Sequence, residues 1–193
     1  MRSLKAKMFN EKAADPKNKP DQIIEAIELK PGHSIADIGA GGGYFTLRFA
    51  DIVGDKGKVY AVDTNPEFLQ FIKSNAEERE LNNIVTILVK NELDLPKSNL
   101  DFVFMRNVTH HLSERVKYFK HLKRFLKAEG KIVIIEYKKG NFFSFRGLFR
   151  HYVPKKTIIS EMKEAGYVLE EEFGFLPEQH FTIYTKQSGV IKK

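Results

Sequence analysis

Short apolar runs alternate with longer stretches of helical periodicity along most of the chain. The apolar runs predict strands over residues 35–38, 58–62, 84–89, 100–105 and 132–136, and two further β-rich segments over 167–175 and 179–186. Apolar residues spaced three or four apart predict helices over 21–29, 45–52, 66–81, 113–127 and 155–165. The run at 84–89 indicates a buried strand. Such alternation is typical of a largely parallel sheet with helices on both faces.

Cap and turn residues divide the chain further. Asp21 precedes a helical pattern as its expected N-cap, and Pro66 lies in the first turn of another helix, a position that proline favours. Residues 1–20 are polar and include two prolines, which predicts an N-terminal arm or a short helix. We expect a single domain over 21–193, in which a long connection covers about 138–154.

A glycine-rich turn follows the first predicted strand. Glycines at 39, 41 and 43 allow the backbone to pass close to a ligand, because they lack a Cβ atom and tolerate unusual φ angles. The next strand ends in Asp63, whose carboxylate can accept hydrogen bonds from both hydroxyls of a ribose. A strand, a glycine turn and a helix, followed by an acidic residue at the next strand's end, indicate a site for an adenosine-containing cofactor.

The spacing of the glycines distinguishes between such cofactors. The dinucleotide fingerprint Gly-x-Gly-x-x-Gly requires a glycine where this chain has Tyr44 or Thr46, so a nicotinamide-dependent dehydrogenase is disfavoured. The chain has instead Asp37-x-Gly39-x-Gly41-x-Gly43, which resembles motif I of the class I methyltransferases that use S-adenosylmethionine (SAM). SAM has no pyrophosphate, and its cationic amino-acid tail suits an acidic residue such as Asp37.

Further stretches are similar to other motifs of the same family. They lie at 91–96, 100–112, 126–134, 165–167 and 176–181, so the resemblance covers about 20–186. The small stand-alone UbiE-like group (methyltransferase type 11), which acts on quinones and other small molecules, is the most similar. The resemblance implies a Rossmann-like α/β fold with a mostly parallel seven-stranded sheet and an antiparallel strand near the C-terminus.

The resemblance also implies a set of residues that bind SAM. They are Asp37, Gly39, Ala40, Gly41, Gly43, Tyr44, Asp63, Thr64, Asn91, Glu92 and Asn107. The acidic residue that usually contacts adenine falls nearest Asn91, so either Asn91 or Glu92 is expected to have that role. An asparagine side-chain oxygen can also accept a hydrogen bond from the adenine amine.

Two histidines follow the fourth predicted strand, at the edge of the sheet where ligands bind. Methyl transfer from a sulfonium needs no acid, and it needs a base only when the acceptor starts protonated. His110 and His111 are the candidate bases, because histidine titrates near neutral pH. In the alternative interpretation one of them packs under the helix or caps it, and only the other faces the substrate.

The connection at 138–154 mixes aromatic and basic residues. We expect it to cap a hydrophobic substrate, which can also be anionic, because loops commonly carry specificity. The expected cap residues are Phe142, Phe145, Arg146, Phe149, His151 and Tyr152. Two other interpretations stay open: an amphipathic helix packed on the sheet's edge, and a surface that contacts RNA or a membrane.

Composition narrows the remaining choices. The chain has 193 residues and no cysteine, which excludes disulfides and thiolate-bound metals and fits a reducing cytoplasm. We expect no metal, no membrane span, and a monomer or homodimer that acts on a small molecule.

The net charge of +7 is typical of proteins that bind nucleic acid or an anionic membrane. Here, however, basic residues recur at helical spacing, which favours a solvated helix face. They are Lys117, Lys120, Lys123, Arg124 and Lys127. The alternatives are an RNA or protein methyltransferase and a SAM-binding protein without catalysis.

Overall fold

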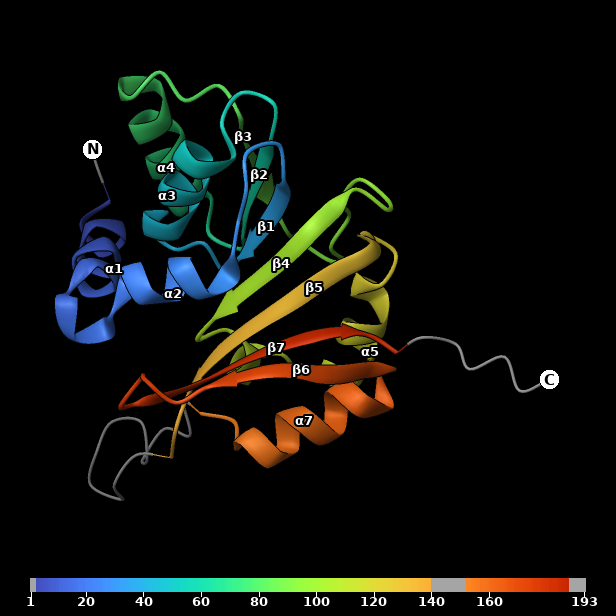
Figure 1. Ribbon diagram of the computed structural model, residues 1–193. Helices are drawn as coiled ribbons and strands as arrows, with labels where there is room; N and C mark the ends of the chain where they lie inside the picture. Colours follow the sequence, from blue (N-terminus) through green and yellow to red (C-terminus); the bar gives the residue numbers. More distant parts are fainter. Residues whose placement is uncertain (1–2, 140–151, 188–193) are drawn as a thin grey trace. The chain divides into compact units, whose positions relative to one another are not determined.

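The computed structural model describes residues 3–139 and 152–187. Its strands form one seven-stranded sheet in the order β3-β2-β1-β4-β5-β7-β6 (Figure 1). Contacts within the chain divide the described residues into two compact units. We call residues 3–96 with 100–104 the N-terminal unit, and 97–99 with 105–139 and 152–187 the C-terminal unit.

Three parallel strands and two helices form the centre of the N-terminal unit. β1 (Ser34–Ile38) pairs with β2 (Lys58–Asp63), which pairs with β3 (Ile84–Leu88). β1 is buried along its whole length, and the helices α3 (Tyr44–Val53) and α4 (Pro66–Glu78) pack against these strands. This arrangement brings the turn after β1 next to the end of β2.

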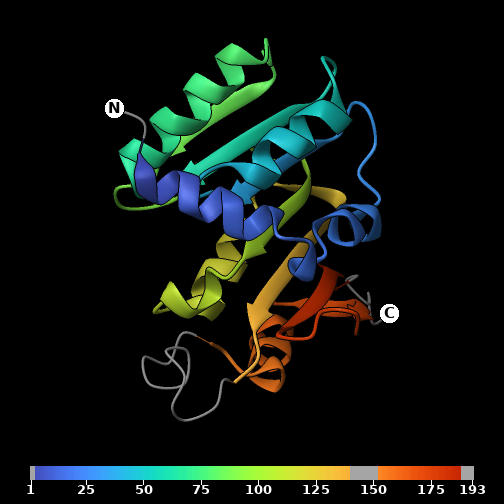
Figure 2. The same ribbon diagram turned by 90° about the vertical axis from the view of Figure 1, so that its left-hand side faces the viewer.

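The N-terminal segment is helical. It contains α1 (Leu4–Ala14), a 3-10 turn η1 (Pro16–Asn18) and the start of α2 (Pro20–Ile27). The Ser3 hydroxyl caps α1 by accepting a hydrogen bond from the Ala6 backbone N–H at 3.4 Å. α1 lies beside α3 and α4, as Figures 1 and 2 show. The short helix considered for this segment is therefore present.

The C-terminal unit is built on an antiparallel arrangement. β7 (Gln179–Lys186) pairs antiparallel with β5 (Leu126–Tyr137) on one side and with β6 (Tyr167–Phe173) on the other. β4 (Leu100–Arg106), of which residues 100–104 belong to the N-terminal unit, leads through the 3-10 turn η2 (Thr109–His111) to α5 (Arg115–Leu122). α7 (Lys155–Glu164) packs on β6. The buried Tyr167 hydroxyl donates a hydrogen bond to the Phe119 carbonyl at 3.0 Å, which joins β6 to α5.

Three local predictions are wrong. β3 is not buried: it ends the strand order, and Val85 is 39% exposed because an edge strand is covered less completely. The helix expected over 113–127 ends at Leu122, and the chain enters β5 at Leu126, so Lys127 lies on a strand. The spacing of apolar residues expected for a helix continues past Leu122, because the residues that follow are also buried although they lead into a strand.

The third correction concerns the start of α2. Its N-cap is Lys19 rather than Asp21, because Pro20 occupies the first helical position, where its fixed φ suits the helix and its missing N–H costs nothing. Asp21 lies in the first turn, and its carboxylate accepts a hydrogen bond from the Arg48 guanidinium at 2.9 Å.

Candidate active site

The turn between β1 and α3 is tight and depends on left-handed glycines. The φ angles of Gly39, Gly41 and Gly43 are +74°, +55° and +81°, a region that residues with a Cβ rarely adopt. The backbone N–H groups of Gly39 and Ala40 both donate to the Val62 carbonyl, at 2.8 and 3.1 Å. These backbone hydrogen bonds fix the turn to β2, and the glycine conformations expected from the sequence are confirmed.

A fourth glycine in this turn is required for a different reason. A Cβ atom on Gly42 would lie 2.1 Å from the Ala6 carbonyl oxygen and 2.2 Å from the Asn10 side-chain oxygen, both on α1. The same Asn10 oxygen accepts a hydrogen bond from the Tyr44 backbone N–H at 3.1 Å. α1 therefore rests directly on the glycine turn. The sequence gives no direct signal of this contact, apart from a third adjacent glycine.

Asp63 joins the end of β2 to the glycine turn. One carboxylate oxygen accepts a hydrogen bond from the Gly41 backbone N–H and the other from the Asn65 backbone N–H, both at 2.9 Å. Asp63 is half-buried, so its carboxylate is held in one orientation at the surface of the N-terminal unit. Asp37, in contrast, is buried in β1, and its carboxylate accepts a hydrogen bond from the Thr46 hydroxyl at 2.6 Å.

The other expected cofactor residues are more dispersed. Ala40 and Tyr44 are half-buried in and after the turn, and Thr64 is exposed next to Asp63. Asn91 and Glu92 are exposed in the segment that follows β3. Asn107 belongs to the C-terminal unit, where its side-chain oxygen accepts a hydrogen bond from the Gln179 amide at 2.6 Å. Within the expected set, the Gly41 backbone N–H donates to the Asp63 carboxylate, and the Gly43 backbone N–H donates to the Ala40 carbonyl at 2.8 Å.

A buried carboxylate organises the C-terminal unit near His110. Glu136, near the end of β5, is fully buried. One of its oxygens accepts hydrogen bonds from the Thr109 hydroxyl at 2.5 Å and the His110 backbone N–H at 3.3 Å. The other contacts His110 Nδ1 at 3.0 Å and accepts from the Tyr137 backbone N–H at 2.9 Å. Nothing in the sequence pattern marks Glu136, which looks like one polar residue at a strand end.

These donors keep the carboxyl group ionised. Burial alone raises the pKa of Glu136, but the contacts with His110, Thr109 and the Tyr137 backbone N–H together lower it by more, so its pKa lies below the ordinary value of a glutamate. The His110 side chain is 6% exposed, whereas His111 is exposed, with its ring centroid 4.1 Å from that of His110. The two candidate bases therefore occupy different environments.

A second histidine is buried in the same unit. The His180 Nε2 atom lies 3.0 Å from the Val153 carbonyl oxygen, and its Nδ1 has no hydrogen-bond partner among the residues that the structure describes. Burial lowers the pKa of His180. Of the expected cap residues, Tyr152 is half-buried; the others, Phe142, Phe145, Arg146, Phe149 and His151, lie outside the described residues.

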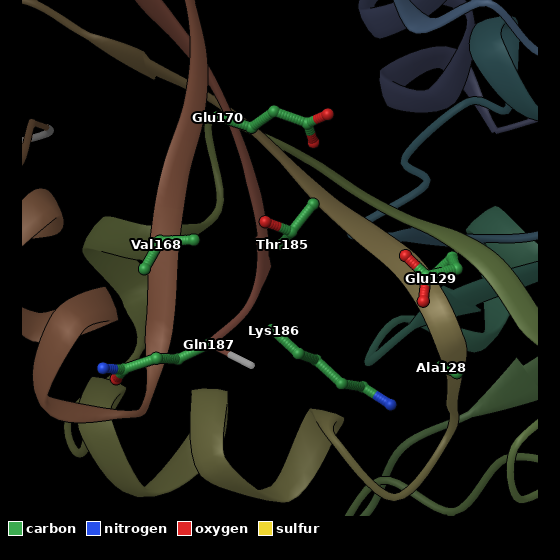
Figure 3. A pocket seen from close by; sticks show the side chains of 7 residues that line it. All are labelled: Ala128, Glu129, Val168, Glu170, Thr185, Lys186 and Gln187. Carbon is green, nitrogen blue, oxygen red and sulfur yellow. The ribbon is translucent and has the colours of Figure 1, made fainter. Parts of the chain in front are cut away.

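A cavity of about 580 Å³ in the C-terminal unit contains none of the expected site residues. Figure 3 shows the seven side chains that line it, from β5, β6, β7 and the residue that follows β7. Two of its charged groups already have partners, because Lys186 donates to the Leu126 carbonyl and Glu170 pairs with Lys131. Within residues 3–139 and 152–187, no three His, Asp or Glu side chains gather in a way that could hold a metal ion.

Comparison with known proteins assigns the chain to a class. A methyltransferase domain model matches residues 29–172, and the chain belongs to this family. The sheet order and the antiparallel β7 confirm the expected Rossmann-like fold of class I methyltransferases, the class whose methyl donor is SAM. In the described part of the chain, no helix has the length and apolar character required to cross a membrane.

Individual relatives are distant. The ubiquinone/menaquinone biosynthesis C-methyltransferase UbiE of a Shewanella strain is 24% identical over 163 residues, which are 81% of this chain and 65% of that protein. A SAM-dependent methyltransferase from Aquifex aeolicus superimposes with a TM-score of 0.83 at 24% identity, covering 93% of this chain and 95% of the other. A type 11 methyltransferase from Sulfolobus solfataricus gives a TM-score of 0.71 at 20% identity, with coverage of 89% and 94%. The chain thus spans about two thirds of the length of its curated relatives.

Proposed function

We propose that this chain binds SAM at the glycine turn and transfers a methyl group to a small-molecule acceptor. The observation that carries the proposal is the hydrogen bond between the Gly41 backbone N–H and the Asp63 carboxylate. It holds a carboxylate, the group that recognises ribose hydroxyls, beside the left-handed glycines of the turn.

The chemistry of the turn fits SAM better than a dinucleotide. Asp37 and Asp63 are both acidic, which favours a cationic ligand and disfavours a pyrophosphate. When bound, SAM supplies an electrophilic methyl group on a positively charged sulfur. We assign the ribose to Asp63, the amino-acid tail to the side of Asp37, and the adenine to Asn91 or Glu92. Ala40, Gly43, Tyr44, Thr64 and Asn107 complete the proposed binding set.

His110 is the base in this proposal. It takes the proton that a phenol, amine or carbon acid loses while the acceptor's electron pair forms the new bond to the methyl carbon. The bond from that carbon to sulfur breaks, and its electrons remain on the sulfur, which leaves uncharged. Most of the remaining rate enhancement comes from alignment, which contributes up to about 7–11 kcal/mol in favourable cases.

The acceptor class follows from the relatives rather than from a cavity. The UbiE relatives are named for C-methylation in ubiquinone and menaquinone biosynthesis, and we propose a quinol-like or other small aromatic acceptor. The segment at 138–154 provides aromatic side chains suited to such a molecule. A cytoplasmic location and a monomer or homodimer remain part of this proposal.

Calorimetric titration of the full chain with SAM, S-adenosylhomocysteine and NAD tests the proposal. We expect micromolar binding of the two sulfur nucleosides and none of NAD. A wild-type chain that binds neither sulfur nucleoside contradicts the proposed function. The Asp51→Asn variant is the matched control, because Asp51 is an exposed carboxylate of the same unit that pairs with Arg79; its affinity for SAM should equal that of the wild type.

A further inference from the structure

Glu136 has an unusually complete set of hydrogen-bond donors. A carboxylate has about four acceptor positions, and four groups lie at hydrogen-bond distance from this one: the Thr109 hydroxyl, the His110 backbone N–H, the His110 Nδ1 atom and the Tyr137 backbone N–H. Its side chain is fully buried, so water does not compete for these positions. In three of these contacts the partner is a donor, namely the Thr109 hydroxyl and the His110 and Tyr137 backbone N–H groups, and such donors favour the ionised form of the carboxyl group.

The filled acceptor positions determine which nitrogen of His110 carries hydrogen. An ionised carboxylate only accepts hydrogen bonds, so the Nδ1 atom, 3.0 Å from Glu136, must be the donor. In a neutral imidazole the other nitrogen then carries the lone pair. Nε2 is therefore the basic atom of this ring.

We propose that Glu136 is a positioning residue that holds His110 in the tautomer with hydrogen on Nδ1, so that Nε2 can accept the proton of the methyl acceptor. This inference rests on the proposed function and adds to it a residue outside the expected site. A buried carboxylate that orients a catalytic imidazole has the same role in serine hydrolases, where it fixes the tautomer without itself taking the proton.

Thr109 provides the matched control, because its hydroxyl donates a hydrogen bond to the same carboxylate. Thr109→Val removes one donor to Glu136 and loosens the turn η2, but it leaves the contact between Glu136 and His110 Nδ1 in place. Glu136→Gln keeps the side-chain shape and replaces one acceptor oxygen with an NH₂ group, which can donate to Nδ1. A merely structural role for Glu136 predicts similar effects of the two variants, whereas a positioning role separates them.

Nitrogen NMR of the histidine-labelled full chain reads the tautomer directly. The chain has six histidines, and a His110→Gln sample identifies the ring in question. Spectra are recorded at a pH high enough for the rings to be neutral. We expect hydrogen on Nδ1 in the wild type and in Thr109→Val, and a transfer of part or all of it to Nε2 in Glu136→Gln.

Two results would overturn the inference. One is a wild-type His110 with its hydrogen on Nε2, which can be observed even if a variant fails to fold. The other is a folded Glu136→Gln variant with an unchanged tautomer. With an acceptor that the enzyme methylates, we also expect turnover at least about tenfold lower in Glu136→Gln than in Thr109→Val, since a general base contributes about 100- to 10,000-fold. SAM titration of the same samples separates the two proposals: absent SAM binding refutes the proposed function, whereas the tautomer tests Glu136.

Discussion

Hydrogen bonds hold both the glycine turn and the Glu136 cluster in one arrangement, but the donors in the turn are backbone groups, whereas the cluster is centred on a buried side chain. In the turn, backbone N–H groups bind the Val62 carbonyl and the Asp63 carboxylate, and the surrounding positions need the absence of a side chain. In the cluster, the Glu136 side chain accepts hydrogen bonds from Thr109 and His110, which lie 27 and 26 positions earlier in the sequence. A site built from backbone leaves glycines in the sequence, whereas a site built from buried side chains leaves scattered polar residues.

Removing the single side chain on which the turn depends should have the largest effect. We expect Asp63→Ala to weaken SAM binding by about 100-fold or more, because two hydrogen bonds to a charged group contribute about 1.5–3 kcal/mol each. Calorimetry measures this against Asp51→Asn. Equal affinity in Asp63→Ala and the wild type would remove Asp63 from the ribose contact.

Adding a side chain to the turn should destabilise the fold itself. Gly42→Ala places a methyl group against the Ala6 carbonyl, and we expect the free energy of unfolding to fall by about 1–3 kcal/mol. Gly174→Ala is the control, since no atom lies within 4 Å of its Cβ position; it should change stability by less than about 0.5 kcal/mol. Urea unfolding measures both. Similar stabilities would mean that α1 does not rest on the turn.

The C-terminal unit should also make stability depend on pH, because it contains a buried histidine that can titrate, whereas the backbone groups of the glycine turn cannot. Burial lowers the pKa of His180 below its ordinary 6.5, so the unfolded chain takes up a proton at a higher pH than the folded chain. Stability should therefore fall as pH drops below about 6.5, by at most about 1.4 kcal/mol per pH unit. This part of the slope should be absent in His180→Gln and present in His33→Gln. Urea unfolding at several pH values compares them, and identical slopes would contradict the prediction.

Breaking one ion pair in each unit should give the smallest difference in the free energy of unfolding. Arg115 donates two hydrogen bonds of 2.7 Å to Glu161 in a half-buried pair, whereas Arg79 and Asp51 are more exposed. We expect Glu161→Gln to cost about 1 kcal/mol and Asp51→Asn less than about 0.5 kcal/mol in the free energy of unfolding. Thermal unfolding in low and high salt measures both; a larger cost for Asp51→Asn would reverse the expected order.

The sequence predicted most elements because strands and helices leave periodic patterns. It failed where a pattern continued across a change of structure: buried residues follow α5 without interruption, so the helix was extended past Leu122 into β5. The prediction that β3 is buried also failed, because burial depends on the strand's position in the sheet, and the composition of one strand does not reveal the strand order.

The site shows the same division. Gly39, Gly41, Gly43 and Asp63 were predictable because their spacing reflects local backbone geometry. Asn10 and Glu136 were not, because each acts through a contact between residues far apart in the sequence. His110 was predicted from its place after β4, and that prediction stays untested; its difference from His111 depends on a carboxylate that only the folded chain brings to it.

If SAM binds as proposed, the contact between α1 and the glycine turn makes the opening of α1 sensitive to ligand binding. A ligand held by Gly41 and Asp63 stabilises the arrangement of the turn on which Asn10 and Ala6 rest, and a ligand that binds one arrangement raises its population. Lysines at 5, 7 and 12 are spread along α1. Cleavage after these lysines by trypsin requires the helix to open, so the resistance of α1 to proteolysis should rise with ligand concentration.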